Sequence, residues 1–220
     1  EEVLPAIESY LMAVLKQRPP SAKYGVPESR HLADPSTAKC VHMLFDEQAA
    51  RTPSAVAIMD AHRQLTYADL KHESDLLARH LQSLGITKGS IVGSYTPHRA
   101  EYIIANLAIF KAGGAIFPLE TNYPADLLAE LIEMAGISVV LTISSMKHNL
   151  PPSHQTDDHC FCLEGEWVQQ LEEAGLAQIK DPQVGLADRA YVTMTSGSTG
   201  RPKGVVNAHI GATHNFLSRF

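Results

Sequence analysis

The segment TMTSGSTGRPKGVV, residues 193–206, brings together residue types that bind phosphate oxygens. Its glycines let backbone amides come close to a ligand, its serine and threonine hydroxyls donate hydrogen bonds, and Lys203 adds a positive charge. This combination predicts a loop that holds a polyphosphate. The alternative is a solvated turn, since small polar residues are common in loops. The residues concerned are Thr195, Ser196, Gly197, Ser198, Thr199, Gly200, Lys203 and Gly204.

The loop does not follow the Walker A pattern, G-x-x-x-x-G-K-[ST]. Counting from Gly197, Pro202 stands where the second glycine belongs, and Gly204 follows the lysine in place of a hydroxyl residue. Because the pattern fails at two positions, the loop is assigned to another class of phosphate site.

Short apolar strands flank this loop, and similar strands alternate with helices through the preceding sequence. The expected helices are 41–50, 68–85, 100–114 and 125–136, and the expected strands are 55–59, 64–67, 90–95, 115–119, 138–143, 190–194 and 204–208. Helices of this length between strands are typical of βαβ units. The predicted fold class is therefore α/β, with a largely parallel sheet.

The first 34 residues differ from the rest of the chain. Apolar residues at helical spacing from Val3 to Leu15 predict one helix, and the prolines at 19 and 20 end it because proline lacks an amide donor. The sequence from Pro20 to Pro35 is polar and irregular, as in a linker. We expect a helix and linker over residues 1–34 and an α/β domain over residues 35–220.

The composition of the 220 residues argues against several classes of protein. A formal net charge of −6 does not fit the broad basic face that nucleic-acid binding requires. No stretch approaches the ~20 apolar residues of a membrane span, and the N-terminus lacks the pattern of a signal peptide. The three cysteines, Cys40, Cys160 and Cys162, indicate a reducing compartment. We expect a cytoplasmic protein without nucleic-acid or membrane partners.

The loop and three further stretches support a family resemblance. YVTMTSGSTGRPKGVV, residues 191–206, resembles the phosphate-loop signature of the adenylate-forming (AMP-binding) superfamily, which includes nonribosomal peptide synthetase adenylation domains, acyl-CoA synthetases and luciferases. LTYADL at 65–70 and FKAGGAIFPLETNYP at 110–124 resemble the first two core motifs of adenylation domains, and VHMLFDEQAARTPSAVAI at 41–58 resembles their opening. The resemblance covers residues 34–220 and implies the N-terminal, incomplete part of the adenylate-forming fold.

In this superfamily a carboxylate attacks the α-phosphorus of ATP, pyrophosphate leaves, and the acyl-adenylate passes to a thiol. The resemblance implies ATP and Mg as cofactors, a small carboxylic or amino acid as substrate, a phosphopantetheine or CoA thiol as acceptor, and a carrier-protein domain as partner. Lys203 would stabilise the charge of the departing pyrophosphate. The nucleotide-binding residues implied by position are Thr195, Ser196, Gly197, Ser198, Thr199, Gly200, Lys203 and His209.

Some residues depart from the usual motifs, and the branch of the superfamily stays open. Met194 replaces a common aromatic residue, Glu120 replaces aspartate, and Leu127 replaces arginine. GGAIFPLETNYP is more similar to the amino-acid-activating branch, which favours a nonribosomal synthetase or a carrier-linked reductase. The alternatives are an acyl-CoA synthetase (fatty acid ligase) and an inactive relative that acts as an interaction module.

The superfamily takes its substrate pocket, its magnesium ligand and its main catalytic lysine from sequence that would follow position 220. No metal ligand is therefore assigned in this chain. We expect the 220 residues alone not to complete the reaction.

Two other features have structural interpretations. Cys160 and Cys162 are separated by one residue, which is closer than the usual zinc-ligand spacing, so CFCLEGEW at 160–167 predicts a buried strand followed by a helix containing Trp167. Lys111 lies at the end of an apolar helix before Gly113, where a cation interacts favourably with the helix dipole. We expect a structural role for the cysteine pair and for the lysine.

Overall fold

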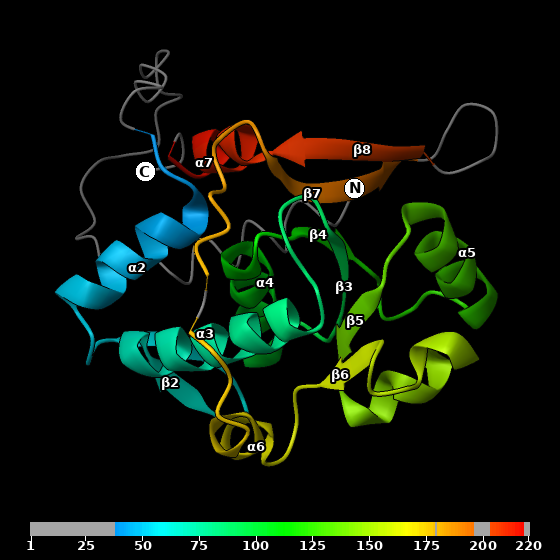
Figure 1. Cartoon of the computed structure of the whole chain (residues 1–220), viewed down its shortest axis with the longest axis horizontal. Coiled ribbons are helices and arrows are strands. Elements are labelled where there is room, and N and C mark those ends of the chain that lie inside the picture. Colours follow the sequence, from blue (N-terminus) through cyan, green and yellow to red (C-terminus); the bar gives the residue numbers. More distant parts are fainter. Residues whose placement is uncertain (1–37, 179, 196–202, 218–220) are drawn as a thin grey trace.

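The computed structural model describes residues 38–178, 180–195 and 203–217. The helix and linker expected over residues 1–34 lie outside these ranges, so that expectation stays a prediction. The described residues form one six-stranded sheet, one two-stranded sheet and the helices that cover them (Figure 1).

The large sheet has the strand order β6-β5-β3-β4-β7-β8. Every neighbouring pair is parallel except β7 and β8, which form an antiparallel hairpin at one edge. The prediction of an α/β fold with a largely parallel sheet is confirmed. The strands are β3 (Ile91–Tyr95), β4 (Ala115–Pro118), β5 (Val139–Thr142), β6 (Cys160–Cys162), β7 (Arg189–Thr195) and β8 (Lys203–Ala208).

The small sheet pairs β1 (Val56–Met59) with β2 (Gln64–Thr66) in antiparallel fashion and leads into the longest helix, α3 (Tyr67–Ser83). Thr66 caps this helix: its hydroxyl accepts a hydrogen bond from the Asp69 amide, and the Asp69 carboxylate accepts one from the Thr66 amide. Tyr67 therefore begins the helix, whereas the sequence pattern placed it in the strand.

The remaining helices alternate with strands as expected, apart from one unpredicted helix at the end of the described chain. α4 and α5 end at Gly113 (φ 93°) and Gly136 (φ 62°), which adopt the left-handed conformation that glycine favours. The helix after β8 was not predicted. The helices are α2 (Val41–Arg51), α4 (Ala100–Ala112), α5 (Ala125–Ala135), α6 (Trp167–Glu173) and α7 (His209–Leu217), with short 3-10 turns at η1 (Ser144–Asn149) and η2 (Pro152–His154).

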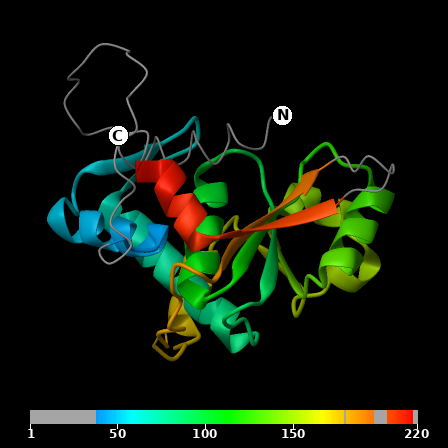
Figure 2. The ribbon, with the colours of Figure 1, turned by 90° about the horizontal axis from the view of Figure 1, so that it is seen from above.

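The two faces of the large sheet carry separate cores. Val139 and Leu141 of β5 pack in a cluster with α2, α3 and α4, whereas Val140 between them packs in a second cluster with α5. This alternation is expected because successive strand residues point to opposite faces. α4 and α5 consequently cover opposite faces, and Figure 2 shows α7 lying beside α2.

The strand at one edge of the sheet, β8, is only partly covered. Its neighbouring residues Val205 and Val206 are 43% and 54% exposed. Because adjacent strand residues point to opposite faces, neither face of β8 is fully packed.

Among the described residues, no helix is long and apolar enough to cross a membrane.

Candidate functional site

The parallel strands place several connecting segments at one edge of the sheet. β3, β4 and β7 run in the same direction, so the segments that follow Tyr95, Pro118 and Thr195 all leave from the carboxyl edge. The segment after β3 enters α4 on one face, and the segment after β4 enters α5 on the other. Ligands of open α/β sheets bind at such a switch point, in the crevice outside the carboxyl ends of the strands.

A small cavity lies at this switch point, with room for about one water molecule. The Thr96 hydroxyl in its wall is buried and has no hydrogen-bond partner among the described residues. Burial raises the pKa of the Tyr102 phenol, and the nearby charge of Glu120 raises it further. The lining residues are Thr96, His98, Tyr102, Pro118, Leu119, Glu120 and Thr121.

The predicted phosphate loop connects the two strands of the edge hairpin. Thr195, the last residue of β7, and Lys203, the first residue of β8, are paired Cα partners at the loop end of this hairpin. The strands expected at 190–194 and 204–208 are confirmed, each with small extensions. The connection itself, with Ser196, Gly197, Ser198, Thr199 and Gly200, lies outside the described residues, as do the side chains of Thr195 and Lys203.

His209 lies at the opposite end of β8 from Lys203. Lys203 is the first of the six residues of β8 and His209 directly follows the last, so the two lie six strand positions apart, about 20 Å. The His209 side chain has no exposed surface, and its ring centroid lies 4.9 Å from that of Phe110 and 5.8 Å from that of His42. In the described residues this histidine fills the core between α2, α4 and α7, so the structure does not bring it to the loop end of the hairpin.

His209 and His42 form a buried histidine pair that the sequence pattern did not predict. Neither ring nitrogen of His209, nor Nδ1 of His42, has a hydrogen-bond partner among the described residues. Burial lowers the pKa of each imidazole to about 4, and the neighbouring His209 also lowers that of His42. Both rings are therefore neutral near pH 7.

Lys111, expected to have a structural role, is buried and ion-paired. Its ammonium lies 2.6 Å from Asp75 Oδ1 on α3 and 3.0 Å from Asp46 Oδ1 on α2, and it donates a hydrogen bond to the Ser74 hydroxyl. It also lies 5.1 Å from the ring centroid of Phe45. These contacts join α4 to α2 and α3. The structural role of Lys111 therefore includes ion pairs between helices, whereas the sequence suggested only an interaction with the helix dipole.

Cys160 and Cys162 form the first and last residues of β6, which precedes α6 and its first residue, Trp167. The expected strand and helix are therefore present. Cys160 is buried, and both cysteines pack with the cluster under α5. In the part of the chain that the structure describes, no three His, Cys, Asp or Glu side chains are grouped closely enough to hold a metal ion.

Known proteins resemble this chain over most of its length. The profile of the family described as AMP-binding enzyme matches residues 45–220. The chain is similar to tyrocidine synthase 1 of Brevibacillus parabrevis, with 36% identity over 187 residues that cover 84% of this chain and 16% of that protein. It is also similar to glycine betaine reductase ATRR of Emericella nidulans, with 36% identity over 187 residues, 84% of this chain and 14% of that protein.

Solved structures show the same relationship. The N-terminal subdomain of NpsA from Klebsiella oxytoca, in complex with 3-hydroxyanthranilyl-AMSN, matches with a TM-score of 0.68 and 29% identity, over 84% of this chain and 45% of that chain. The nonribosomal peptide synthetase FmoA3 in its AMPPNP-bound form matches with a TM-score of 0.70 and 28% identity, over 94% of this chain and 19% of that chain. The chain thus spans less than a fifth of the length of the two curated relatives.

Proposed function

Because the chain belongs to the AMP-binding enzyme family and matches the N-terminal subdomain of an adenylation enzyme, we propose that it forms the phosphate-binding part of an adenylation domain. The complete domain activates a carboxylic acid, in particular an amino acid, as an acyl-adenylate and releases pyrophosphate. One observation carries this proposal. The hairpin pairs Thr195 with Lys203 where a loop of glycine, serine and threonine must connect them, beside the switch point of the sheet.

The roles of the loop residues follow from the chemistry of the leaving group. Negative charge grows on the β- and γ-phosphates of ATP as pyrophosphate departs, and fixed donors stabilise that charge. We assign the backbone amides and hydroxyls of the loop to the phosphate oxygens and the Lys203 ammonium to the leaving pyrophosphate. Mg²⁺ would neutralise further phosphate charge, and no residue of this chain is assigned to it. The residues proposed to bind the nucleotide are Thr195, Ser196, Gly197, Ser198, Thr199, Gly200 and Lys203.

His209 is proposed to support this site from a distance. Its backbone amide donates a 2.9 Å hydrogen bond to the Asp188 carbonyl, which precedes β7, and its ring packs on Phe110. Both contacts fix the end of the hairpin away from the loop. A packing role thus replaces, in this proposal, the direct nucleotide contact implied by its sequence position.

The acceptor of the acyl group is proposed to be the phosphopantetheine thiol of a carrier-protein domain. The peptide synthetases among the relatives and an NpsA structure described as an artificially fused adenylation–PCP didomain support a carrier as partner. Similarity to glycine betaine reductase ATRR supports a second candidate, a carrier-linked reductase that shares the adenylation step.

The test is substrate-dependent exchange of labelled pyrophosphate into ATP. We expect exchange with at least one member of an amino-acid panel when the 220 residues are part of the longer parent protein, and none above the no-enzyme control with the 220-residue chain alone. Exchange only with fatty acids would support the acyl-CoA synthetase alternative. A parent protein that binds ATP but gives no exchange with any acid would support the inactive relative.

A further inference from the structure

A second, larger cavity than the one at the switch point lies away from the phosphate loop. It has a volume of about 530 Å³, within the range of small-molecule sites. Gly85, Ile86 and Thr87 in its wall directly precede the segment that enters β3, so the cavity lies toward the amino edge of the parallel sheet. The phosphate loop leaves from the carboxyl edge, and the two places are therefore distinct.

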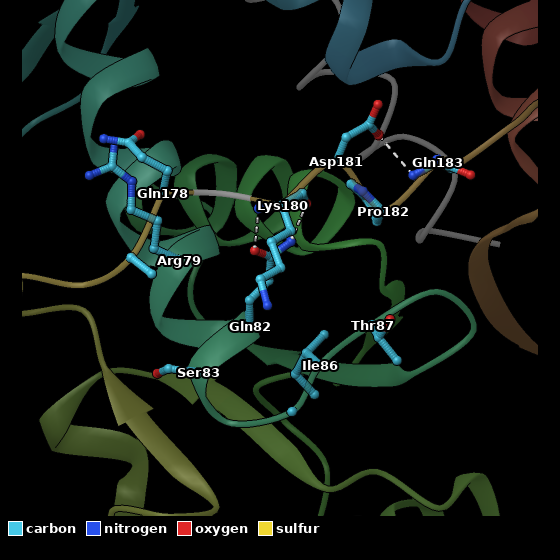
Figure 3. A pocket seen from close by; sticks show the side chains of 12 residues that line it. Arg79, Gln82, Ser83, Ile86, Thr87, Gln178, Lys180, Asp181, Pro182 and Gln183 are labelled. Atoms are coloured by element: carbon cyan, nitrogen blue, oxygen red, sulfur yellow. Dashed lines mark hydrogen bonds between the residues drawn. The ribbon is translucent and has the colours of Figure 1, made fainter.

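The cavity is formed by two segments about 100 positions apart in the sequence. One is the end of α3 and the turn after it, residues 79–87; the other is the segment between α6 and β7 (Figure 3). Gln82 joins them, because its side-chain amide donates a 2.8 Å hydrogen bond to the Lys180 carbonyl and its side-chain oxygen accepts a 2.9 Å hydrogen bond from the Lys180 amide. Lys88 also donates to the Gln183 carbonyl, at 3.3 Å. The walls are thus held in place without a ligand.

Two cations of the cavity have no partner in the part of the chain that the structure describes. The guanidinium of Arg79 makes no hydrogen bond or ion pair there, and its Nε atom is inaccessible and unpartnered. The Lys180 ammonium has no ion pair in these ranges either, since only its backbone is bonded to Gln82. The one carboxylate in the wall, Asp181, accepts a 2.8 Å hydrogen bond from the Gln183 amide. With two cations and one carboxylate, the wall carries a net positive charge in a chain whose formal net charge is −6.

The rest of the lining adds polar and apolar surface. Figure 3 shows Arg79 toward one end of the cavity and Lys180 near its middle, with Ile86 and Pro182 on the side of Lys180 away from Arg79. The Gln178 amide adds polar groups. Ile86 is buried and supplies apolar surface for an organic group. Arginine and lysine side chains together match the charge and hydrogen-bonding capacity of a phosphate dianion better than those of a single carboxylate.

We propose that this cavity is a second binding site, separate from the phosphate loop, for a small phosphorylated organic molecule. The phosphate is held by Arg79 and Lys180, and the organic part lies over Ile86 and Pro182. Both long side chains have heads free of intramolecular ion pairs in the described ranges, so both can turn toward one dianion. The proposal does not depend on the activity assigned to the loop.

The test uses the ¹⁵N-labelled 220-residue chain titrated with inorganic phosphate, with amide NMR shifts as the readout. We expect saturable shifts at Gly85, Thr87 and the Gln82 side-chain amide. Arg79→Gln and Lys180→Gln should each weaken this binding by about tenfold or more, because each removes a charge-assisted contact. Well-dispersed spectra of both variants establish that they are folded.

Lys203→Ala is the matched control, since it removes a cation from the phosphate loop and leaves the cavity intact. It should leave the cavity shifts unchanged, so that failure of the loop assignment and failure of this proposal are distinguishable. Shifts confined to residues near 195–203 would overturn the second site. Acetate binding as tightly as phosphate would overturn the assignment of a dianion. Small, non-saturating shifts that are equal in all variants would mean an adventitious ion only.

Discussion

Lys111 Nζ lies 2.6 Å from Asp75 Oδ1, inside the contact between α4 and α3. The lysine side chain is 4% exposed and the aspartate side chain 20% exposed, so this pair is largely removed from water. Burial raises the pKa of the Asp75 carboxyl, but the attraction of Lys111 and Lys71 outweighs it and holds that pKa below its ordinary value. The Asp75 carboxylate is thus ionised at neutral pH.

Replacement of this lysine is expected to destabilise the protein strongly. Lys111→Met removes the buried cation and leaves Asp75 and Asp46 with only the partly exposed Lys71, so the loss of unfolding free energy should approach the roughly 3 kcal/mol of a broken buried pair. Urea denaturation followed by circular dichroism measures the change. The control is Lys39→Met: Lys39 pairs with Glu47 at the surface, where the side chains are 48% and 50% exposed, and its loss should cost less than about 1 kcal/mol. Equal effects of the two substitutions would contradict the structural role of Lys111.

The buried histidine pair should make stability depend on pH. The pKa of His42 and that of His209 are each about 4 in the folded protein, below the ordinary value of about 6.5. Because the unfolded chain binds these protons more readily, the unfolding free energy is highest above pH 6.5 and falls as the pH decreases toward 4. Each histidine should account for about 2 kcal/mol between pH 7 and pH 5, a window in which most carboxylates stay ionised.

Urea denaturation at several pH values in this window measures that slope. His209→Gln removes one titrating ring, so its unfolding free energy should change less between pH 7 and pH 5 than that of the parent chain. Histidine ring signals followed by NMR provide a direct readout, and a titration of His209 near pH 6.5 would refute its burial as a neutral ring.

Lys203→Ala in the parent enzyme should slow adenylate formation more than it weakens binding of the acid. The lysine contacts charge that grows in the transition state, and a charge-assisted hydrogen bond is worth about 1.5 to 3 kcal/mol, or roughly 10- to 150-fold in rate. Single-turnover measurement with ATP and the acid varied separately isolates this step. Lys39→Ala serves as the surface control, and a parental rate for Lys203→Ala at saturating ATP would remove the lysine from the proposed site.

The cysteine pair of β6 should act in packing and bind no metal. Cys160→Ser places a hydroxyl among the apolar side chains under α5 and should lower the unfolding free energy by about 1 to 2 kcal/mol, whereas Cys162→Ser, on a half-buried residue, should cost less. Metal analysis of the purified chain should find far less than one zinc ion per molecule. Stoichiometric zinc that only strong chelators remove would refute this prediction.

The sequence predicted the local features of the fold better than the relationships between distant segments. The order of strands and helices was readable from apolar runs and from glycine stops such as Gly113, because those signals lie within each element. The position of β3 between β4 and β5 was not readable, since strand adjacency depends on packing between segments far apart in the chain.

In the candidate site, too, the local features could be predicted from the sequence and the contacts between distant segments could not. The loop between β7 and β8 has a local signature, so its flanking strands could be predicted. α7 was missed because no capping residue marks its start at His209. Burial of His209 depends on His42 and Phe110, which are about 100 or more positions away. The cavity beside Arg79 likewise depends on residues 177–178 and 180–183.

The partly covered strand β8 has a practical consequence for work with this chain in solution. An edge strand with exposed valines is a template on which a second chain can add a strand, and such pairing grows with protein concentration. Val206→Lys would place a charge on this edge and should suppress self-association without touching the core. Light scattering of the two chains across a concentration series would show whether the exposed edge of β8 sets the solubility limit of the protein.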